Sequence, residues 1–216
     1  MSNNTAILLG ATGEVGGHLL QELVTNPHYR KIYVLGRASI NKLPNYQKIE
    51  KIIINFNKPI VNQSILIGAD VFCAIGTGER QDFEKVDYGH AYGFAKLCAG
   101  KVKSFNLVSA MGANSQTSYK YLQVKGRLEQ DLLALDLGNQ RFYRPSMLIA
   151  PQRKNLDWSE AVWIKIFQVI SPALVGPMAG WKGMKTADLA RSMVTNALSE
   201  NPQTVYLHAD MMATRS

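Results

Sequence analysis

The chain has 216 residues, of which 46% are hydrophobic and 19% are charged. This composition is typical of a folded protein and excludes a disordered one, and the length suits one α/β domain. Lysine and arginine number 24 against 16 aspartate and glutamate residues, so the net charge is +8. Such an excess favours an anionic partner, which could be a phosphorylated cofactor, a nucleic acid or a membrane surface.

The cysteines and the N-terminal residues exclude further classes. Cys73 and Cys98 lie in apolar or helical patterns without metal-ligand spacing, so neither a disulfide scaffold nor a metal site is expected. The first residues, Met1–Thr5, show neither the charged region nor the cleavage site of a signal peptide. The charge-free stretch Ile166–Trp181 contains prolines and glycines and would make a poor membrane span. We therefore expect a cytoplasmic protein.

Short runs rich in isoleucine, valine and leucine recur along the chain, with helical patterns between them. Such runs are typical of strands that are buried on both faces of a parallel sheet. The predicted strands are Ala6–Leu9, Ile32–Leu35, Ile52–Ile54, Val71–Ile75, Phe105–Val108, Phe142–Ile149 and Val205–Leu207. The predicted helices are Gly13–Val24, Tyr88–Ala99, Tyr119–Leu135, Trp158–Ile170 and Ala187–Leu198. Their alternation predicts an α/β fold with a Rossmann-type, doubly wound parallel sheet.

Three glycines, at positions 10, 13 and 16, follow the first predicted strand and open the first predicted helix. Gly10 would permit a tight turn, Gly13 would let the backbone approach a pyrophosphate, and Gly16 would let the helix pack on the strand. The N-terminus of the helix would then face the phosphate with free N–H groups. Three glycines alone also suit an ordinary turn, but with a strand before and a helix after them they predict dinucleotide binding.

The end of the second predicted strand distinguishes the two nicotinamide cofactors. Enzymes that select NAD usually carry an acidic residue there, which binds the ribose 2′-hydroxyl. This chain instead has Gly36 and Arg37, with no carboxylate nearby. The planar cation of Arg37 could hold a 2′-phosphate, so NADP (NADPH) is the preferred cofactor. The alternative is that Arg37 is an ordinary solvated arginine.

Two tyrosines precede a lysine by four residues, which places each pair on one face of a helix. In such a pair the ammonium can assist the phenol, and the phenol can transfer a proton to a substrate. The pair Tyr92/Lys96 lies on a helix that packs on the sheet, and we interpret it as a chance match. Tyr121/Lys125 follows the strand whose end delivers Ser109 to the ligand-binding edge, where a serine could polarise a carbonyl oxygen. We therefore predict that Ser109, Tyr121 and Lys125 are catalytic.

Five segments occur in the order seen in one known family: Gly10–Gly16, Phe72–Thr77, Phe105–Ser109, Tyr121–Gly126 and Tyr143–Ser146. The chain resembles the atypical short-chain dehydrogenases/reductases, in particular the small NADPH-binding oxidoreductases similar to the Tat-interacting protein. The resemblance implies bound NADP, an active centre at the three residues named above, and a single NAD(P)-binding Rossmann domain over 1–216, with 152–185 as a small C-terminal substrate lobe. It assigns cofactor binding to Gly10, Thr12, Gly13, Glu14, Val15, Gly16, Arg37, Asn55, Phe56, Ala74, Ile75, Gly76, Thr77, Tyr121, Lys125, Arg144, Pro145, Ser146 and Met147.

The chain departs from the family pattern at two places. Asn55 stands where the family often has an aspartate that contacts adenine. The residues after Ser109 are Ala110, Met111 and Gly112, where relatives tend to have Ser-Lys-Gly. An asparagine keeps a hydrogen bond to the base but carries no charge, and the second change alters the pocket wall.

These observations favour an NADPH-dependent oxidoreductase that transfers a hydride to a small carbonyl substrate, with Tyr121 as proton donor. The alternative is an NADPH-binding regulatory or scaffold protein with little catalytic activity. A sugar-nucleotide epimerase is disfavoured because too few residues follow Arg144 to build a large substrate lobe. The basic residues are dispersed, so direct nucleic-acid binding is not expected. The apolar helix Trp158–Ile170 could pack the lobe, line the substrate pocket or form a homodimer contact.

Overall fold

The computed structural model describes residues 4–76, 82–146, 148–149, 183–201 and 203–213. Seven parallel strands form one sheet in the order β3-β2-β1-β4-β5-β6-β9, which confirms the predicted doubly wound parallel sheet. They are β1 (Thr5–Leu9), β2 (Lys31–Gly36), β3 (Ile49–Ile53), β4 (Asp70–Cys73), β5 (Ser104–Val108), β6 (Asn139–Tyr143) and β9 (Val205–Tyr206). The strand order reverses between β1 and β4, which is where ligands bind in such sheets.

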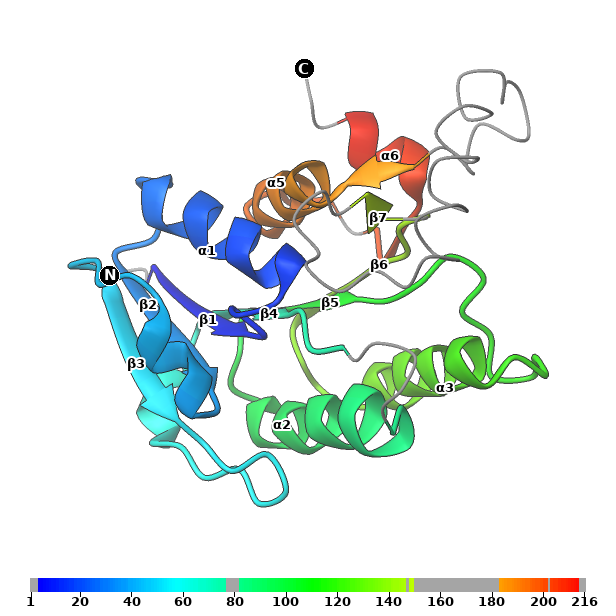
Figure 1. The fold of residues 1–216 in the computed structure, drawn as a ribbon, viewed down its shortest axis with the longest axis horizontal. Helices are drawn as coiled ribbons and strands as arrows, with labels where there is room; N and C mark the ends of the chain where they lie inside the picture. The colour runs from blue at the N-terminus through cyan, green and yellow to red at the C-terminus, as the bar shows by residue number, and fades with distance from the viewer. Residues whose placement is uncertain (1–3, 77–81, 147, 150–182, 202, 214–216) are drawn as a thin grey trace.

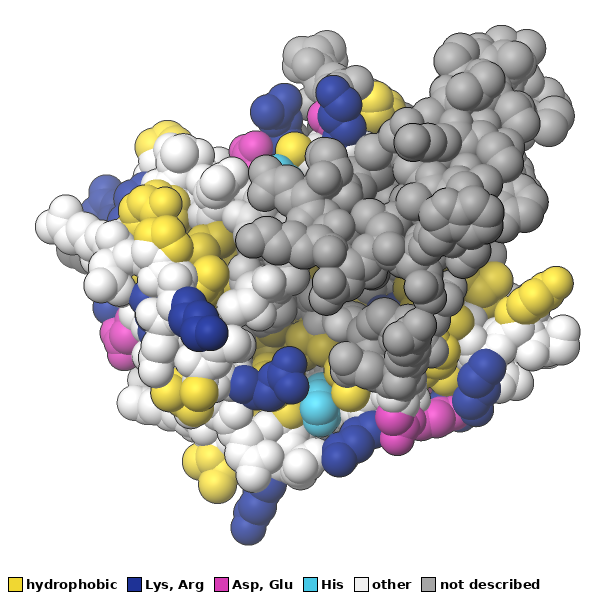
Figure 2. Space-filling view, in the orientation of Figure 1, with side chains coloured by type: hydrophobic (Ala, Val, Ile, Leu, Met, Phe, Trp, Pro, Cys, Tyr) yellow, Lys and Arg dark blue, Asp and Glu magenta, His cyan; other side chains and the backbone are white. Residues whose placement is uncertain are grey.

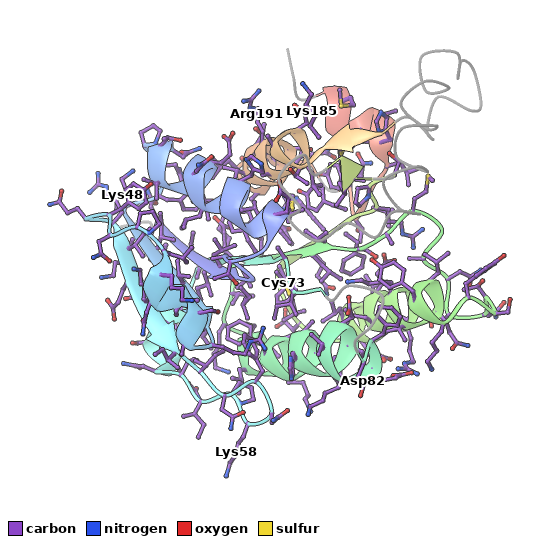
Figure 3. All side chains as sticks on the ribbon, viewed as in Figure 1. Lys48, Lys58, Cys73, Asp82, Lys185 and Arg191 are labelled. Atoms are coloured by element: carbon purple, nitrogen blue, oxygen red, sulfur yellow. The ribbon has the colours of Figure 1, made fainter. Side chains whose placement is uncertain are left out.

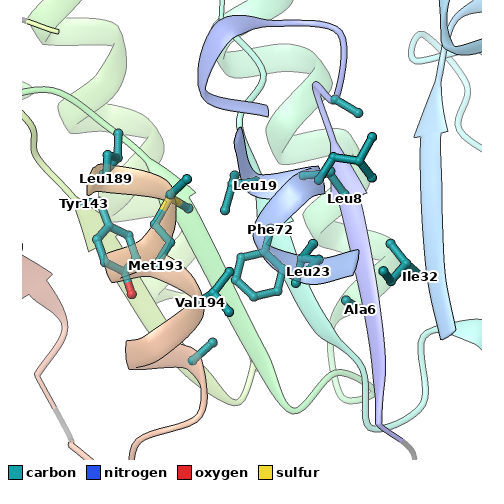
Figure 4. Close-up of a cluster of buried hydrophobic side chains, with 14 of the residues drawn as sticks. Ala6, Leu8, Leu19, Leu23, Ile32, Phe72, Tyr143, Leu189, Met193 and Val194 are labelled. Atoms are coloured by element: carbon teal, nitrogen blue, oxygen red, sulfur yellow. The ribbon is translucent and has the colours of Figure 1, made fainter. Parts of the chain in front are cut away.

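Helices cover both faces of the sheet. Figure 1 shows α1 (Glu14–Thr25) and α5 (Thr186–Ala197) on one face, and α2 (Ala91–Cys98) and α3 (Lys120–Leu133) on the other. Successive residues of β1 point to opposite faces, so Leu8 packs with α1 and α5, whereas Leu9 packs towards α2 and α3. Figure 4 shows Phe72 of β4 beside Leu23 of α1 and Val194 of α5, in the core of the first face. Burial on both faces explains why the central strands β1 and β4 are mostly apolar, whereas the edge strand β3 carries Glu50 and Lys51.

The predicted strand Phe142–Ile149 is wrong, because it divides into two strands. β6 ends at Tyr143, and β7 (Leu148–Ile149) pairs instead with β8 (Met184–Lys185) in a separate two-stranded sheet. Pro145 lies between them and has no N–H to continue the ladder. The chain is therefore redirected immediately beyond the edge of the main sheet.

Other predicted elements are shifted or lie outside the described residues. The predicted helix Tyr88–Ala99 begins as a π-helical segment, Glu84–His90, and becomes α2 only at Ala91. Short 3₁₀ turns cover Ala38–Lys42 and Gln63–Ile65, and α6 (His208–Ala213) follows β9. The predicted helix Trp158–Ile170 lies outside the described residues, as does most of the lobe 152–185.

Among the described residues on the face seen in Figure 2, lysine and arginine side chains lie scattered rather than gathered in one area. Within the part of the chain that the structure describes, no helix is long and apolar enough to cross a membrane.

Candidate functional site

The loop between β1 and α1 brings the chain close to the end of β4. Gly10 has φ +86°, in the left-handed region, and a Cβ there would overlap the carbonyl group of Ala74. A Cβ on Gly16 would overlap the carbonyl oxygen of Gly10. The amide of Ala74 donates to the carbonyl of Leu9 at 3.0 Å. The first and third glycines are therefore required for this close approach of the backbone.

The second glycine leaves the outer side of the loop open. The Gly13 amide donates to the Gly10 carbonyl at 2.9 Å, and among the described residues a Cβ on Gly13 would meet only that oxygen, at 3.3 Å. Gly13 is also the N-cap of α1, and no side chain caps the helix there. Thr12 is exposed, whereas Glu14 and Val15 are half-buried in the first turn. An uncapped helix N-terminus behind a glycine-rich loop fits a pyrophosphate.

Basic and aromatic groups gather beyond β2 and β3. Arg37 is exposed and directly follows β2, and Ile54 donates its amide to the carbonyl of Gly36 at 2.9 Å. This contact holds Asn55 and Phe56 beside the end of β2. The Asn55 side chain accepts the amide of Asn57 at 3.0 Å in a local turn.

The ring of Phe56 stacks on His90 with a centroid distance of 5.1 Å. Burial lowers the pKa of His90, and the nearby charges of Lys85 and Arg37 lower it further. The charges of Arg37 and Lys85 therefore make this region electropositive, as a 2′-phosphate site requires.

The end of β4 lies at the switch point between the glycine loop and α2. Figure 3 shows Cys73 near the middle of the sheet. Burial raises the pKa of the Cys73 thiol to about 11, so this cysteine is unreactive. Ala74, Ile75 and Gly76 are partly exposed beyond the strand, whereas the predicted Thr77 lies outside the described residues.

Tyr121 and Lys125 lie on one face of α3, as their spacing predicts. The Lys125 ammonium is 5.8 Å from the centre of the Tyr121 ring and 3.4 Å from the Val108 carbonyl oxygen at the end of β5. Tyr121 is 36% exposed, whereas Lys125 is only 2% exposed. The phenol can therefore meet a ligand, while the ammonium stays beneath it.

The Lys125 ammonium has a partner that the sequence did not indicate. Its Nζ atom lies 3.0 Å from the Oδ1 atom of Asp87, which is 1% exposed. Burial alone would lower the pKa of Lys125, but Tyr121 and Asp87 raise it above its ordinary value. The lysine is therefore held in its charged form, the form that attracts a phenolate.

Ser109 lies in a different set of contacts from the one predicted. It continues the alternation of Phe105 and Leu107 towards the α3 face, and its hydroxyl donates to the buried Glu129 carboxylate. Among the described residues, no hydrogen bond joins Ser109 to Tyr121. The proton that would polarise a substrate carbonyl is thus donated to Glu129 in this structure.

Arg144 also binds Glu129. Its Nε donates to Oε1 at 3.1 Å, and its Nη2 donates to Oε2. Together Glu129 and Arg144 line a cavity of about 310 Å³ with Gly126 and Phe142. The side chain of Arg144 is therefore directed to α3 in this structure. Glu129 could have been found from the sequence, because it follows Tyr121 and Lys125 at the same four-residue spacing.

The remaining predicted residues follow β6. The Pro145 carbonyl accepts the Met111 amide at 3.0 Å, which ties the loop after β5 to the loop after β6. The Ser146 hydroxyl lies 3.3 Å from Nδ1 of His208, at the start of α6. Met147 lies outside the described residues.

Comparisons with known proteins identify relatives of this chain. No protein-family model matches it. It is 32% identical to Protein HTATIP2 of Rattus norvegicus over 162 residues, which are 72% of this chain and 67% of that one. It is 35% identical over 156 residues to Protein FMP52-1, mitochondrial, of Scheffersomyces stipitis, with 67% of each chain covered.

Solved structures of low sequence identity share the fold. The reductase domain of PhqB from Penicillium fellutanum matches 95% of this chain and 67% of its own, with a TM-score of 0.66 and 14% identity. The UDP-glucuronic acid 4-epimerase of Bacillus cereus, in complex with UDP-glucuronic acid and NAD, matches 93% of this chain and 76% of its own, with a TM-score of 0.65 and 15% identity. These likenesses establish the Rossmann architecture only.

The relatives also correct one expectation. The FMP52 proteins of Scheffersomyces stipitis, Debaryomyces hansenii and Candida albicans are named as mitochondrial. The expected cytoplasmic location is therefore wrong, because an unremarkable N-terminal sequence does not establish a compartment. On fold and relatives together, the chain belongs to the atypical short-chain dehydrogenase/reductase family, whose members are NAD(P)-binding Rossmann proteins.

Proposed function

We propose that this protein is an NADPH-dependent reductase of a small carbonyl compound, with Tyr121 as the proton donor. The observation that carries the proposal is the arrangement on α3, where a partly exposed phenol lies above a buried, charged lysine. The pair stands at the ligand-binding edge of the sheet, because Lys125 contacts the end of β5. A proton donor placed there can protonate the oxygen of a reduced carbonyl group.

The glycine loop and the end of β4 fit the dinucleotide. The backbone of Gly10–Gly16 and the N-terminus of α1 would hold the pyrophosphate, and Gly76 leaves room at the end of β4. The guanidinium of Arg37 would hold the 2′-phosphate that distinguishes NADP from NAD. The bound cofactor supplies the hydride. Tyr121 supplies the proton, and Lys125 stabilises the phenolate that remains.

The test compares two tyrosines that each have a lysine ammonium at a similar distance from the ring. Tyr121→Phe should abolish the oxidation of NADPH by a panel of small aldehydes and ketones, because the hydroxyl is the proton donor. Tyr92→Phe is the matched control, because Lys96 lies 5.3 Å from the Tyr92 ring on α2, much as Lys125 does for Tyr121. The control should keep full activity. Turnover that survives Tyr121→Phe refutes the assigned role, and a panel without any turnover refutes the reductase.

A second function is favoured by the contacts of Ser109. Its hydroxyl donates to Glu129, and the next two residues, Ala110 and Met111, carry no hydroxyl, so positions 109–111 offer no free hydroxyl to polarise a carbonyl in this structure. This arrangement suits a protein that binds NADPH and signals its presence to a partner with little catalysis. The affinity for a captured partner should then change with the ratio of NADP to NADPH. An affinity that ignores this ratio excludes the second function.

We also propose a mitochondrial location and a homodimer. The location rests on the names of the FMP52 relatives, and fractionation of cells that express the tagged protein tests it. The homodimer rests on the apolar sequence Trp158–Ile170, which lies outside the described residues. Light scattering of the purified protein should give twice the chain mass, and a monomer at micromolar concentration excludes the homodimer.

A further inference from the structure

The π-helical segment before α2 contacts both residues of the proposed proton-transfer pair. The carbonyl of Phe83 accepts the amides of Asp87 at 3.0 Å and of Tyr88 at 3.1 Å, so the turn is wider than an α-helical one. The ring of Phe83 lies 5.3 Å from the ring of Tyr121, and the carboxylate of Asp87 lies 3.0 Å from the ammonium of Lys125. Phe83 and Asp87 are four residues apart, and so are Tyr121 and Lys125, so the two segments meet in register.

The ion pair between Asp87 and Lys125 is costly to break because it is buried. Asp87 is the buried residue of its π-helical segment, and its Oδ1 atom would lie 3.5 Å from a Cβ on Gly76. The carboxylate thus lies directly beneath the strand end that is predicted to face the cofactor. Widened turns of this kind are frequent at functional sites because they redirect one side chain.

We propose that Asp87 is a positioning residue for proton transfer: its carboxylate keeps the Lys125 ammonium charged and fixed beneath Tyr121, while Phe83 holds the ring of Tyr121. The proposal rests on the proposed reductase function. It explains why a lysine that is almost completely buried carries its charge next to the phenol. It also assigns a role to the π-helical turn, since a regular α-helix would direct this position elsewhere.

Within the part of the chain that the structure describes, three titratable groups act on the charge of Lys125. They are Asp87 on the π-helical segment, Tyr121 on its own helix and the thiol of Cys73 on β4. Burial raises the pKa of Cys73, so this thiol stays neutral near pH 7. Near pH 7, Asp87 therefore provides the negative charge in this group of side chains. Removing it should make Lys125 lose its proton at a lower pH.

The experiment follows Lys125 itself. The protein is labelled with ¹⁵N-lysine, the Nζ resonance of Lys125 is assigned with Lys125→Arg, and its titration is recorded. Asp87→Asn should lower the midpoint by about 1 to 3 pH units, the range typical of losing a close opposite charge. Asp131→Asn is the matched control: it changes a carboxylate that accepts the Tyr88 hydroxyl at 2.7 Å, across the same two segments, and it should leave the midpoint unchanged.

Two further variants complete the test. Asp87→Glu keeps the negative charge, so the titration midpoint of Lys125 should return most of the way to its wild-type value. If Asp87→Asn does not fold, the smaller neutral Asp87→Ser takes its place. In turnover assays, the alkaline limb of the kcat profile should move to lower pH in the neutral variant, while the KM for NADPH stays the same.

The outcomes separate the role of Asp87 from the reaction. An unchanged Lys125 midpoint in the neutral variants overturns the role of Asp87, whether or not the protein reduces carbonyl compounds. A shifted midpoint in a protein that turns over no carbonyl compound refutes the reductase function and not the Asp87–Lys125 coupling. A midpoint that shifts equally in Asp131→Asn also overturns the proposal.

Discussion

Replacing Lys125 with methionine measures how strongly the buried ion pair supports the fold. Methionine keeps the length and the apolar stem of the side chain but removes the ammonium. Asp87, 1% exposed and 3.0 Å from that ammonium, would be left as a buried carboxylate without its counter-charge. Breaking a buried pair by removing one partner costs about 3 to 5 kcal/mol. The free energy of unfolding should therefore fall by about that amount.

A second variant shows whether the loss comes from the unpaired charge. Asp87→Leu combined with Lys125→Met replaces both charged side chains with apolar ones. Such double replacements are often neutral or stabilising, so the double variant should recover most of the lost stability. The coupling between the two changes should be at least about 2 kcal/mol, within the range known for residues in contact. The double variant should nevertheless be inactive, because Lys125 is absent.

The assay is urea unfolding followed by far-ultraviolet circular dichroism, with equal slopes required before midpoints are compared. Lys96→Met is the control, because Lys96 is exposed and lies over the ring of Tyr92 in the same way. It should change stability by less than about 0.5 kcal/mol. If Lys125→Met costs less than about 1 kcal/mol, or if the double variant is no more stable than the single one, the interpretation of the pair as a buried, mutually dependent unit is wrong.

Three other predictions address the cofactor site. Gly10→Ala should abolish NADPH binding, measured by cofactor fluorescence, because alanine is strained at φ +86° and its Cβ would overlap Ala74; retained affinity contradicts this. Arg37→Ser should weaken NADPH at least tenfold and NADH little by calorimetry, and an equal loss for both excludes a 2′-phosphate contact. His90→Gln should reduce the loss of stability between pH 7.5 and pH 5. The folded protein lowers the pKa of His90, so its contribution is present above the ordinary value of about 6.5 and is lost as the pH falls through the lower folded value. Equal losses in variant and wild type, measured by urea unfolding at both pH values, refute it.

The periodicity of the sequence predicted most of the fold. Buried parallel strands are almost entirely apolar, so the main strands appear as short runs, and even the weak run near Val205 is the last strand of the sheet. Where prediction failed, a local backbone feature intervened. Pro145 ends β6 early, and the widened turn at Glu84–His90 has no signal in hydrophobic periodicity.

The glycine loop and the Tyr121/Lys125 pair could be predicted because each pattern depends on spacing within one short segment. Gly16 is required by its close contact with the nearby Gly10, and Gly10 is required where the loop meets Ala74 at the end of β4. Lys125 follows Tyr121 by one helical turn. The sequence by itself therefore determined the fold class, the position of the glycine loop and the shared helix face of Tyr121 and Lys125.

Only the tertiary structure decided which groups neutralise the buried charges. Asp87 comes from a segment far from α3 in the sequence, and Ser109 turns to Glu129 because the sheet alternation directs it to the α3 face. Such pairings depend on which side chains meet after the helices pack on the sheet, and no pattern within a single segment records that. A buried charge must nevertheless have a partner, so packing, rather than spacing, determined the electrostatics of the site.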